Sequence, residues 1–206
     1  MAEAGSSNRT LVLASSNQGK LREITAILQP LGWQVAPQGD WDVPDAVEDG
    51  LSFVENALIK ARHAAKLTGL PALADDSGLA VDALDGAPGI YSARYAGDAG
   101  DEANTRKLLE NLEDIPHSDR TAHFYCAMVL VHHAEDPAPL IAIGRWDGLI
   151  THEPAGDGGF GYDPVFHVPE KGCTSAELPS EVKNLMSHRG KALQQMVRLI
   201  RDESGA

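Results

Sequence analysis

The stretch from Ser52 to Val81 decides the fold, and it reads SFVENALIKARHAAKLTGLPALADDSGLAV. Ser52 and Glu55 form a capping box, in which the serine oxygen accepts a hydrogen bond from the glutamate amide and the glutamate reaches back to the helix start. Gly69 and Pro71 end the helix, because glycine favours a left-handed cap and proline cannot continue the hydrogen bonding. The residues between predict a helix with an inner face of Val54, Leu58, Ala61 and Ala65.

Two short strands are predicted after this helix, over 72–74 and 79–81, and they place Asp75 and Asp76 at a strand end. Sites in α/β folds gather at the carboxyl ends of strands, so this carboxylate pair is a candidate for chemistry. Before the capped helix, the pattern predicts a strand over 10–15, a helix over about 20–31, a strand over 33–36 and an acidic loop over 40–50.

The second half of the chain also alternates between strands and helices. Predicted elements are a helix over about 102–112, strands over 122–132 and 140–146, a glycine-rich loop over 151–163, a short helix over 179–186 and a last helix from Ser187 to Arg201. The two strands form a hairpin across residues 134–139, which predicts a mixed sheet within an α/β fold.

Length and charge narrow the class of protein. A chain of 206 residues is typical of one domain, so we expect a single α/β domain over residues 10–206 behind a polar tail, residues 1–9. With 17 Lys and Arg against 30 Asp and Glu, the formal net charge is −13, which excludes a broad basic surface for nucleic acid. No apolar run is long enough to span a membrane, and no signal peptide is evident, so we expect a cytoplasmic protein.

A polar turn lies between the first strand and the first helix, and it reads Ser15-Ser16-Asn17-Gln18-Gly19-Lys20. Such a turn points backbone N–H groups and the positive helix end at one place, which suits phosphate. It is not a P-loop, because Ala14 stands at the first glycine position and Leu21 replaces the metal-binding hydroxyl residue. An ordinary strand-to-helix turn with a surface lysine is the alternative.

Three carboxylates, Glu48, Asp75 and Asp76, are candidate metal ligands. Adjacent carboxylates repel each other unless a cation or hydrogen bonds offset the repulsion. Mg²⁺ takes hard oxygen ligands, typically one or two carboxylates together with substrate phosphates. A solvated acidic turn is the alternative interpretation of the Asp75–Asp76 pair.

Two segments near the C-terminus are candidates for binding a base. Residues 156–161 match G-x-G-x-x-G, but Pro154 and Pro164 flank them and argue against a dinucleotide-dependent oxidoreductase, so a loop presenting Phe160 and Asp163 is the better interpretation. In the last helix, residues 187–190 put His188 and Arg189 into the first turn, where a cation opposes the helix dipole by roughly 0.3–1 kcal/mol. Either these side chains point to an anion or a base edge, or they are exposed polar residues.

Taken together, six segments in this order resemble the inosine triphosphate pyrophosphatase family, and the likeness covers residues 11 to about 193. One departure is Ser16, which stands where bacterial members often have glycine in the first loop. The segments are Leu13–Lys20, Phe53–Ala57 with Lys60–Ala61, Ala74–Leu79, Gly86–Arg94, Gly158–Pro164 and Ser187–Gly190.

The resemblance implies a mixed central sheet flanked by helices, with two lobes around a cleft, and a homodimer. It implies Mg²⁺-dependent hydrolysis of ITP, dITP or XTP to the monophosphate and pyrophosphate. A non-catalytic nucleotide sensor is the alternative function, although such a protein needs no acidic cluster.

The resemblance also implies roles for single residues. Asp76 corresponds to the proton acceptor and a metal ligand, and Glu48 to a second acidic group near the metal; Asp75 remains an alternative for either role. The triphosphate end comprises Ser15, Ser16, Asn17, Gln18, Gly19, Lys20 and Lys60, and Ser77 is a further substrate-binding residue. The base and sugar end comprises Phe160, Gly161, Tyr162, Asp163, Lys183, His188 and Arg189.

Overall fold

The computed structural model describes residues 9–15, 21–22, 24–25 and 28–204. The predicted polar tail, apart from residue 9, and the residues from Ser16 to Lys20 in the predicted phosphate turn lie outside this part. The described residues 21–22, 24–25 and 28 are helical, as the apolar spacing predicted for the first helix.

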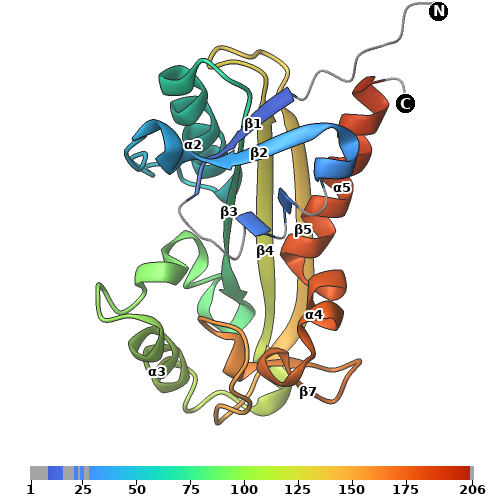
Figure 1. Ribbon diagram of the computed structural model, residues 1–206. Coiled ribbons are helices and arrows are strands. Elements are labelled where there is room, and N and C mark those ends of the chain that lie inside the picture. Colours follow the sequence, from blue (N-terminus) through green and yellow to red (C-terminus); the bar gives the residue numbers. More distant parts are fainter. Residues whose placement is uncertain (1–8, 16–20, 23, 26–27, 205–206) are drawn as a thin grey trace, which may run out of the picture. The chain divides into compact units, whose positions relative to one another are not determined.

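Seven strands form one mixed sheet in the order β2-β1-β3-β4-β5-β6-β7 (Figure 1). β1 pairs in parallel with β2 and β3, whereas β6 pairs antiparallel with β5 and β7. The prediction of a mixed α/β sheet is therefore confirmed. The strands are β1 (Arg9–Leu13), β2 (Trp33–Pro37), β3 (Ala72–Val81), β4 (Thr121–Val131), β5 (Leu140–Ile150), β6 (Phe166–Val168) and β7 (Cys173–Thr174).

The predicted helices are also present, as α2 (Phe53–Thr68), α3 (Asp101–Asn111), α4 (Ser180–Met186) and α5 (His188–Ser204). The predicted N-cap of α2 is confirmed, because Glu55 donates its N–H to Ser52 Oγ at 3.3 Å. The returning bond differs from that of a capping box: Glu55 Oε2 accepts from the N–H of Leu51, one residue before the cap, at 3.0 Å. Gly69 ends α2 in the left-handed conformation, with φ of 68°.

The inner face of α2 differs in part from the prediction. Ala61 and Ala65 are buried as expected, but Val54 and Leu58 are only half-buried. The buried face of α2 consists of smaller side chains than predicted and also includes Asn56, Ala57 and Ala64. Small residues let the helix approach β1 closely, and α2 packs against that strand (Figure 1).

The predicted break between two short strands at residues 75–78 is wrong. β3 runs unbroken from Ala72 to Val81, so Asp75 and Asp76 lie in the middle of a ten-residue strand. Successive side chains on a strand point to opposite faces, so the two carboxylates are not side by side. Residues 75–78 are polar and have low strand propensity, so their place in the sheet depends on contacts with other elements, such as that of Asp76 with Lys60.

The chain groups into two compact units. Unit 1 comprises residues up to 76 with 127–142 and those from 193 onward, and unit 2 comprises 77–126 and 143–192. β3, β4 and β5 contribute residues to both, and the single domain over 10–206 stays a prediction. The core of unit 2 includes Phe124, Trp146 and Phe166, with ring centroids 4.6 Å apart for Phe124–Phe166 and 5.2 Å for Trp146–Phe166.

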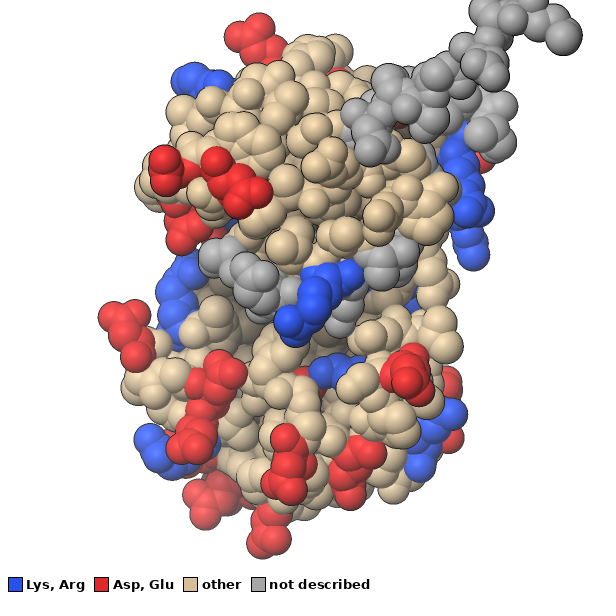
Figure 2. Space-filling model, viewed as in Figure 1, with Lys and Arg blue, Asp and Glu red and all other residues tan. Residues whose placement is uncertain are grey.

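The surface is in keeping with the acidic composition. On the face drawn in Figure 2, acidic side chains are scattered and basic side chains lie singly among them. Among the helices that the structure describes, none is long and apolar enough to cross a membrane.

Candidate active site

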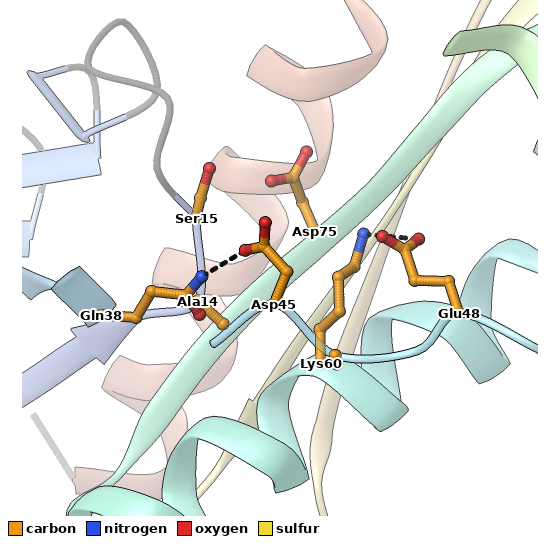
Figure 3. A pocket seen from close by; sticks show the side chains of 8 residues that line it. Ala14, Ser15, Gln38, Asp45, Glu48, Lys60 and Asp75 are labelled. Carbon is orange, nitrogen blue, oxygen red and sulfur yellow. Dashed lines mark hydrogen bonds and ion pairs between the residues drawn. The ribbon is translucent and has the colours of Figure 1, made fainter. Parts of the chain in front are cut away.

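Unit 1 holds a pocket of about 260 Å³ that several elements line (Figure 3). Ser15 follows β1, Lys60 lies on α2, Asp75 lies on β3, and a loop before α2 supplies Glu48. Residues that the sequence analysis found in three separate segments therefore meet at one place. The full lining is Ala14, Ser15, Gln38, Asp45, Ala46, Glu48, Lys60 and Asp75.

Lys60 is the electrostatic centre of this group. Its Nζ donates to Glu48 Oε2 at 3.1 Å and to Asp76 Oδ1 at 3.0 Å. Burial alone lowers the pKa of the Lys60 ammonium, but the charges of Asp76, Glu48 and Asp75 outweigh burial and raise the pKa above its usual value. Lys60 is therefore a firmly charged cation that is already paired, so an incoming phosphate must compete with carboxylates for it.

Asp76 has one satisfied oxygen and one unsatisfied oxygen. Oδ1 accepts from Lys60, whereas Oδ2 is buried and finds no hydrogen-bond partner among the residues that the structure describes. Burial raises the pKa of the Asp76 carboxyl more than the charge and hydrogen bond of Lys60 lower it. A hydrogen bond from Asn56 also favours the ionised form of Asp76. A cation or a water molecule at the buried Oδ2 would stabilise that form further.

The three predicted metal ligands do not form one cluster. Asp75 lines the pocket and is buried, whereas Asp76 lies on the next position of β3 and bonds to Lys60. Within the described part of the chain, no three His, Cys, Asp or Glu side chains are arranged to hold a metal ion by themselves. A metal at this place needs further ligands from elsewhere, and substrate phosphates and water are the usual ones for Mg²⁺.

Two residues of this pocket were missed by the sequence analysis. Gln38 Nε2 donates to Asp45 Oδ1 at 2.8 Å, and both side chains line the cavity. Asp45 falls in the segment predicted only as an acidic loop. Nothing in the local pattern of either residue distinguishes it from other polar loop residues.

Unit 2 holds the second group of predicted site residues, around Phe160. The Phe160 ring is 58% exposed, although aromatic rings of this size are usually buried. Lys183 Nζ lies 5.3 Å from the ring centroid and Arg189 Cζ lies 5.7 Å from it. Arg189 Nη2 also donates to Ser77 Oγ at 3.4 Å. Two cations therefore lie beside one exposed ring, and one of them, Arg189, is also held by Ser77.

Asp163 is buried and holds the loop around Phe160 by hydrogen bonds. It is only 3% exposed, and its Oδ2 accepts from Phe160 N–H at 2.8 Å and from Lys183 Nζ. Its Oδ1 accepts from Ser175 Oγ at 2.8 Å. Gly159 is required beside it, because φ is +75° and an added Cβ would lie 2.1 Å from Asp163 Oδ2.

Tyr162 is a core residue: its ring is buried and its hydroxyl donates to Ser92 O at 2.8 Å. Of the four loop residues predicted to enclose a base, Phe160 is therefore exposed and Gly161 half-buried, while Tyr162 and Asp163 are buried. The loop leads into a 3₁₀ turn, Asp163–Val165, and no α-helix follows the glycines. This geometry confirms that G-x-G-x-x-G is not a dinucleotide fingerprint here.

The start of α5 places His188 and Arg189 differently. Ser187 Oγ accepts from Gly190 N–H at 3.1 Å, which confirms the predicted N-cap. The buried His188 ring stacks on Phe124, with centroids 4.7 Å apart and an interplanar angle of 12°. Arg189 extends toward Phe160. One first-turn residue therefore packs on the core and the other reaches the exposed ring.

Comparisons with known proteins place the chain in a family. A family model described as Ham1 family matches residues 11–199. A curated protein of Shigella flexneri named dITP/XTP pyrophosphatase is 58% identical over 193 residues, covering 93% of this chain and 98% of that protein.

Solved structures resemble the chain as well. A HAM1 protein from Coxiella burnetii has a TM-score of 0.91 and 51% identity, covering 94% of this chain and 99% of that one. A nucleoside-triphosphatase / dITP/XTP pyrophosphatase from Mycobacterium abscessus has a TM-score of 0.75 and 46% identity, covering 90% of this chain and 97% of that one.

Proposed function

The chain belongs to the Ham1 family, and we propose that it hydrolyses non-canonical purine nucleoside triphosphates, ITP, dITP and XTP, to the monophosphate and pyrophosphate. The names of the similar proteins support this activity. The observation that carries it in this chain is the Lys60 cation held between Glu48 and a partly buried Asp76.

The triphosphate end of the substrate belongs to unit 1 in this proposal. A pocket of about 260 Å³ is smaller than the range of about 300–1,000 Å³ for drug-sized ligands, which suits a phosphate chain better than a whole nucleotide. Ser15 and Lys60 act here together with Ser16, Asn17, Gln18, Gly19 and Lys20, which lie outside the described residues. Ser77, also predicted to bind substrate, belongs to unit 2, where its Oγ accepts from Arg189.

Mg²⁺ fits the donor set, because the site offers carboxylate oxygens and one buried Asp76 oxygen without a partner in the described part of the chain. Asp76 and Glu48, which both accept from Lys60, would hold the ion, which when bound would offset triphosphate charge and polarise the phosphoryl oxygen. Asp75 points to the other face of β3 and is a poorer partner for Asp76. Lys60 neutralises the carboxylates until the substrate arrives and then shares its charge with phosphate.

Asp76 is the proton acceptor in this proposal. The attacking water forms a bond to the α-phosphorus, and the bond from that phosphorus to the α–β bridging oxygen breaks, so pyrophosphate leaves. Asp76 takes the proton that the water loses. The raised pKa of Asp76 supports this role, because a stronger base accepts a proton more readily.

The base end belongs to unit 2. Phe160 offers an exposed face for stacking, and Arg189 and Lys183 offer donors beside it. A 6-keto oxygen accepts from such donors, whereas the 6-amino group of adenine leaves them unpaired. Sites that leave buried donors unpaired can reject a near-isostere by up to about 10⁴-fold. Tyr162, Asp163 and His188 support this end from the core.

Pyrophosphate release across ITP, dITP, XTP, GTP and ATP, with Mg²⁺ or with a chelator, tests the proposal. We expect the three non-canonical substrates to give a far higher kcat/KM than ATP, with pyrophosphate as the first product and turnover lost on chelation. Equal turnover of ATP and ITP, or orthophosphate as first product, contradicts it. Binding without turnover would favour the sensor alternative, against which the paired Lys60 and Asp76 argue.

The family resemblance further supports a homodimer that acts in the cytoplasm on free nucleotides, without nucleic-acid or membrane partners. These expectations form part of the same proposal. Sedimentation of the purified chain at several concentrations distinguishes a dimer from a monomer.

A further inference from the structure

Two hydrogen bonds join helix α3 to Gly161, the residue after Phe160. Gly161 donates its N–H to Asp101 Oδ2 at 2.9 Å, and its carbonyl accepts from Thr105 Oγ1 at 3.3 Å. Asp101 and Thr105 are four residues apart and so lie on the same face of the helix. Both hydrogen-bonding groups of one loop residue are therefore held by one helix.

The backbone on the other side of Phe160 is held as well. Phe160 donates its N–H to the buried Asp163, while the next N–H along the chain, that of Gly161, goes to Asp101. The ring between these two fixed amides is 58% exposed. These hydrogen bonds fix the backbone from which the ring extends, and a fixed backbone lowers the ordering cost of binding a ligand there.

α3 itself is anchored independently of this loop. Asn104 Nδ2 donates to Ala93 O at 3.1 Å, and Asn104 Oδ1 accepts from Ala96 N–H at 2.6 Å. Gly100 occupies the N-cap of α3 and provides no side-chain cap. The Asp101 carboxylate, although it lies in the first turn, bonds to the loop. The helix therefore acts as a fixed support to which Gly161 is attached.

We propose that Asp101 and Thr105 are positioning residues for the purine base: by holding Gly161 they orient the Phe160 ring on which the base stacks. The inference rests on the proposed function, in which this loop takes the base. Neither residue touches the substrate. Their removal therefore weakens recognition of the base and leaves recognition of the phosphate chain unchanged.

The test compares two ligands on the full-length protein: ITP, which carries a base, and inorganic tripolyphosphate, which carries none. We expect Asp101→Ala to raise the KM for ITP about tenfold, since hydrogen bonds to charged groups are the stronger ones, with kcat changed less than about twofold. The inhibition constant of tripolyphosphate should not change. Thr105→Val should give a smaller rise in KM, about threefold, because a neutral hydrogen bond is lost.

Conservative variants separate positioning from folding. Asp101→Asn keeps an oxygen that accepts the Gly161 N–H, and Thr105→Ser keeps the hydroxyl, so both should restore the KM for ITP. Glu102→Ala is the matched control, because Glu102 is an exposed carboxylate in the same first turn of α3. Its KM should equal that of the wild type.

Two kinds of result overturn the inference. In the first, the wild type hydrolyses ITP, but the variants raise the KM for ITP and the inhibition constant of tripolyphosphate by the same factor. This result contradicts the positioning role and leaves the proposed function intact. A wild type without ITP turnover removes both. If Asp101→Ala fails to fold, Thr105→Val and the two conservative variants decide the question, by the ratio of the KM for ITP to the inhibition constant of tripolyphosphate.

Discussion

The two compact units hold their functional side chains in different ways. In unit 1, Lys60, Glu48 and Asp76 hold one another by ion pairs, and a ligand must exchange with those pairs. In unit 2, the exposed ring of Phe160 lies beside Lys183 and Arg189, and hydrogen bonds hold the N–H groups of Phe160 and Gly161. The first arrangement is sensitive to the charge of a ligand, whereas the second presents a held surface that favours ligands of matching shape. Substitutions in unit 1 should therefore change kcat, and substitutions in unit 2 should change KM and base preference.

The largest effect is expected for Asp76→Asn, which keeps the shape of the side chain and removes its charge. Loss of the proton acceptor should lower kcat roughly 10²- to 10⁴-fold. Burial penalises the Asp76 charge, whereas the ion pair with Lys60 favours it, and Lys60 keeps Glu48 as a partner in the variant, so the melting temperature should stay close to that of the wild type. Steady-state kinetics and a thermal melt check both. A kcat near that of the wild type at saturating Mg²⁺ contradicts the role.

Phe160→Ala is expected to weaken binding of ITP by the free energy of one base-stacking contact. Stacking of a base on an aromatic ring contributes about 1–3 kcal/mol, so the KM for ITP should rise roughly tenfold or more while kcat changes little. Leu185→Ala is a matched control, because Leu185 is 68% exposed and lies in the same unit. A fall in kcat without a change in KM would put Phe160 in the chemistry and break the distinction between the units.

How far the sequence alone predicts this molecule depends on the range of the interactions. The helix α2 and its cap were predictable, because the signal lies within four residues. The unbroken strand β3 was not, because Asp75-Asp76-Ser77-Gly78 has the composition of a turn and becomes a strand through pairing and through the contact of Asp76 with Lys60. Local pattern decides local structure, and contacts across the chain can override it.

The same limit applies to the site. The segments that carry Lys60, Asp76 and Phe160 could be chosen from their residue types and order. Burial could not: Asp163 and Tyr162 fall in the predicted base loop, yet both are buried. The contact between Asp101 and Gly161 spans 60 positions and has no signal in either segment.

The pH dependence should also distinguish the units, with a moderate effect that belongs to Asp76. This carboxyl must be ionised to accept a proton, so kcat/KM should fall as the pH falls through its pKa. Because burial raises that pKa, the fall should begin at a higher pH than for an ordinary aspartate. A divalent cation favours the ionised form, so a higher Mg²⁺ concentration should move the fall to lower pH.

Profiles of kcat/KM for ITP at low and high Mg²⁺ measure this shift. Residual activity of Asp76→Asn is the control, because titration of the substrate phosphates remains in that variant. A fall that does not move with Mg²⁺, or that the Asp76→Asn profile shares in full, assigns the titration to another group. Phe160→Ala should show the same profile as the wild type, since unit 2 plays no part in the proton transfer.

The smallest effect is expected from the helix caps, and here the same substitution should have different consequences in the two units. Ser52→Ala removes the cap of α2 and should lower the free energy of unfolding by about 1 kcal/mol, which is a fall of about 2–4 °C in Tm for a chain of this size. The kinetic constants should not change, because Lys60 lies about two turns along the helix, beyond the end that frays.

Ser187→Ala removes the cap of α5, whose first turn carries Arg189. It should cost similar stability and also raise the KM for ITP a few-fold, whereas Ser187→Asp, which keeps an acceptor, should restore both. Melts and steady-state kinetics on the three variants decide the matter: an altered kcat in Ser52→Ala at unchanged Tm would mean that the cap of α2 takes part in positioning Lys60 after all.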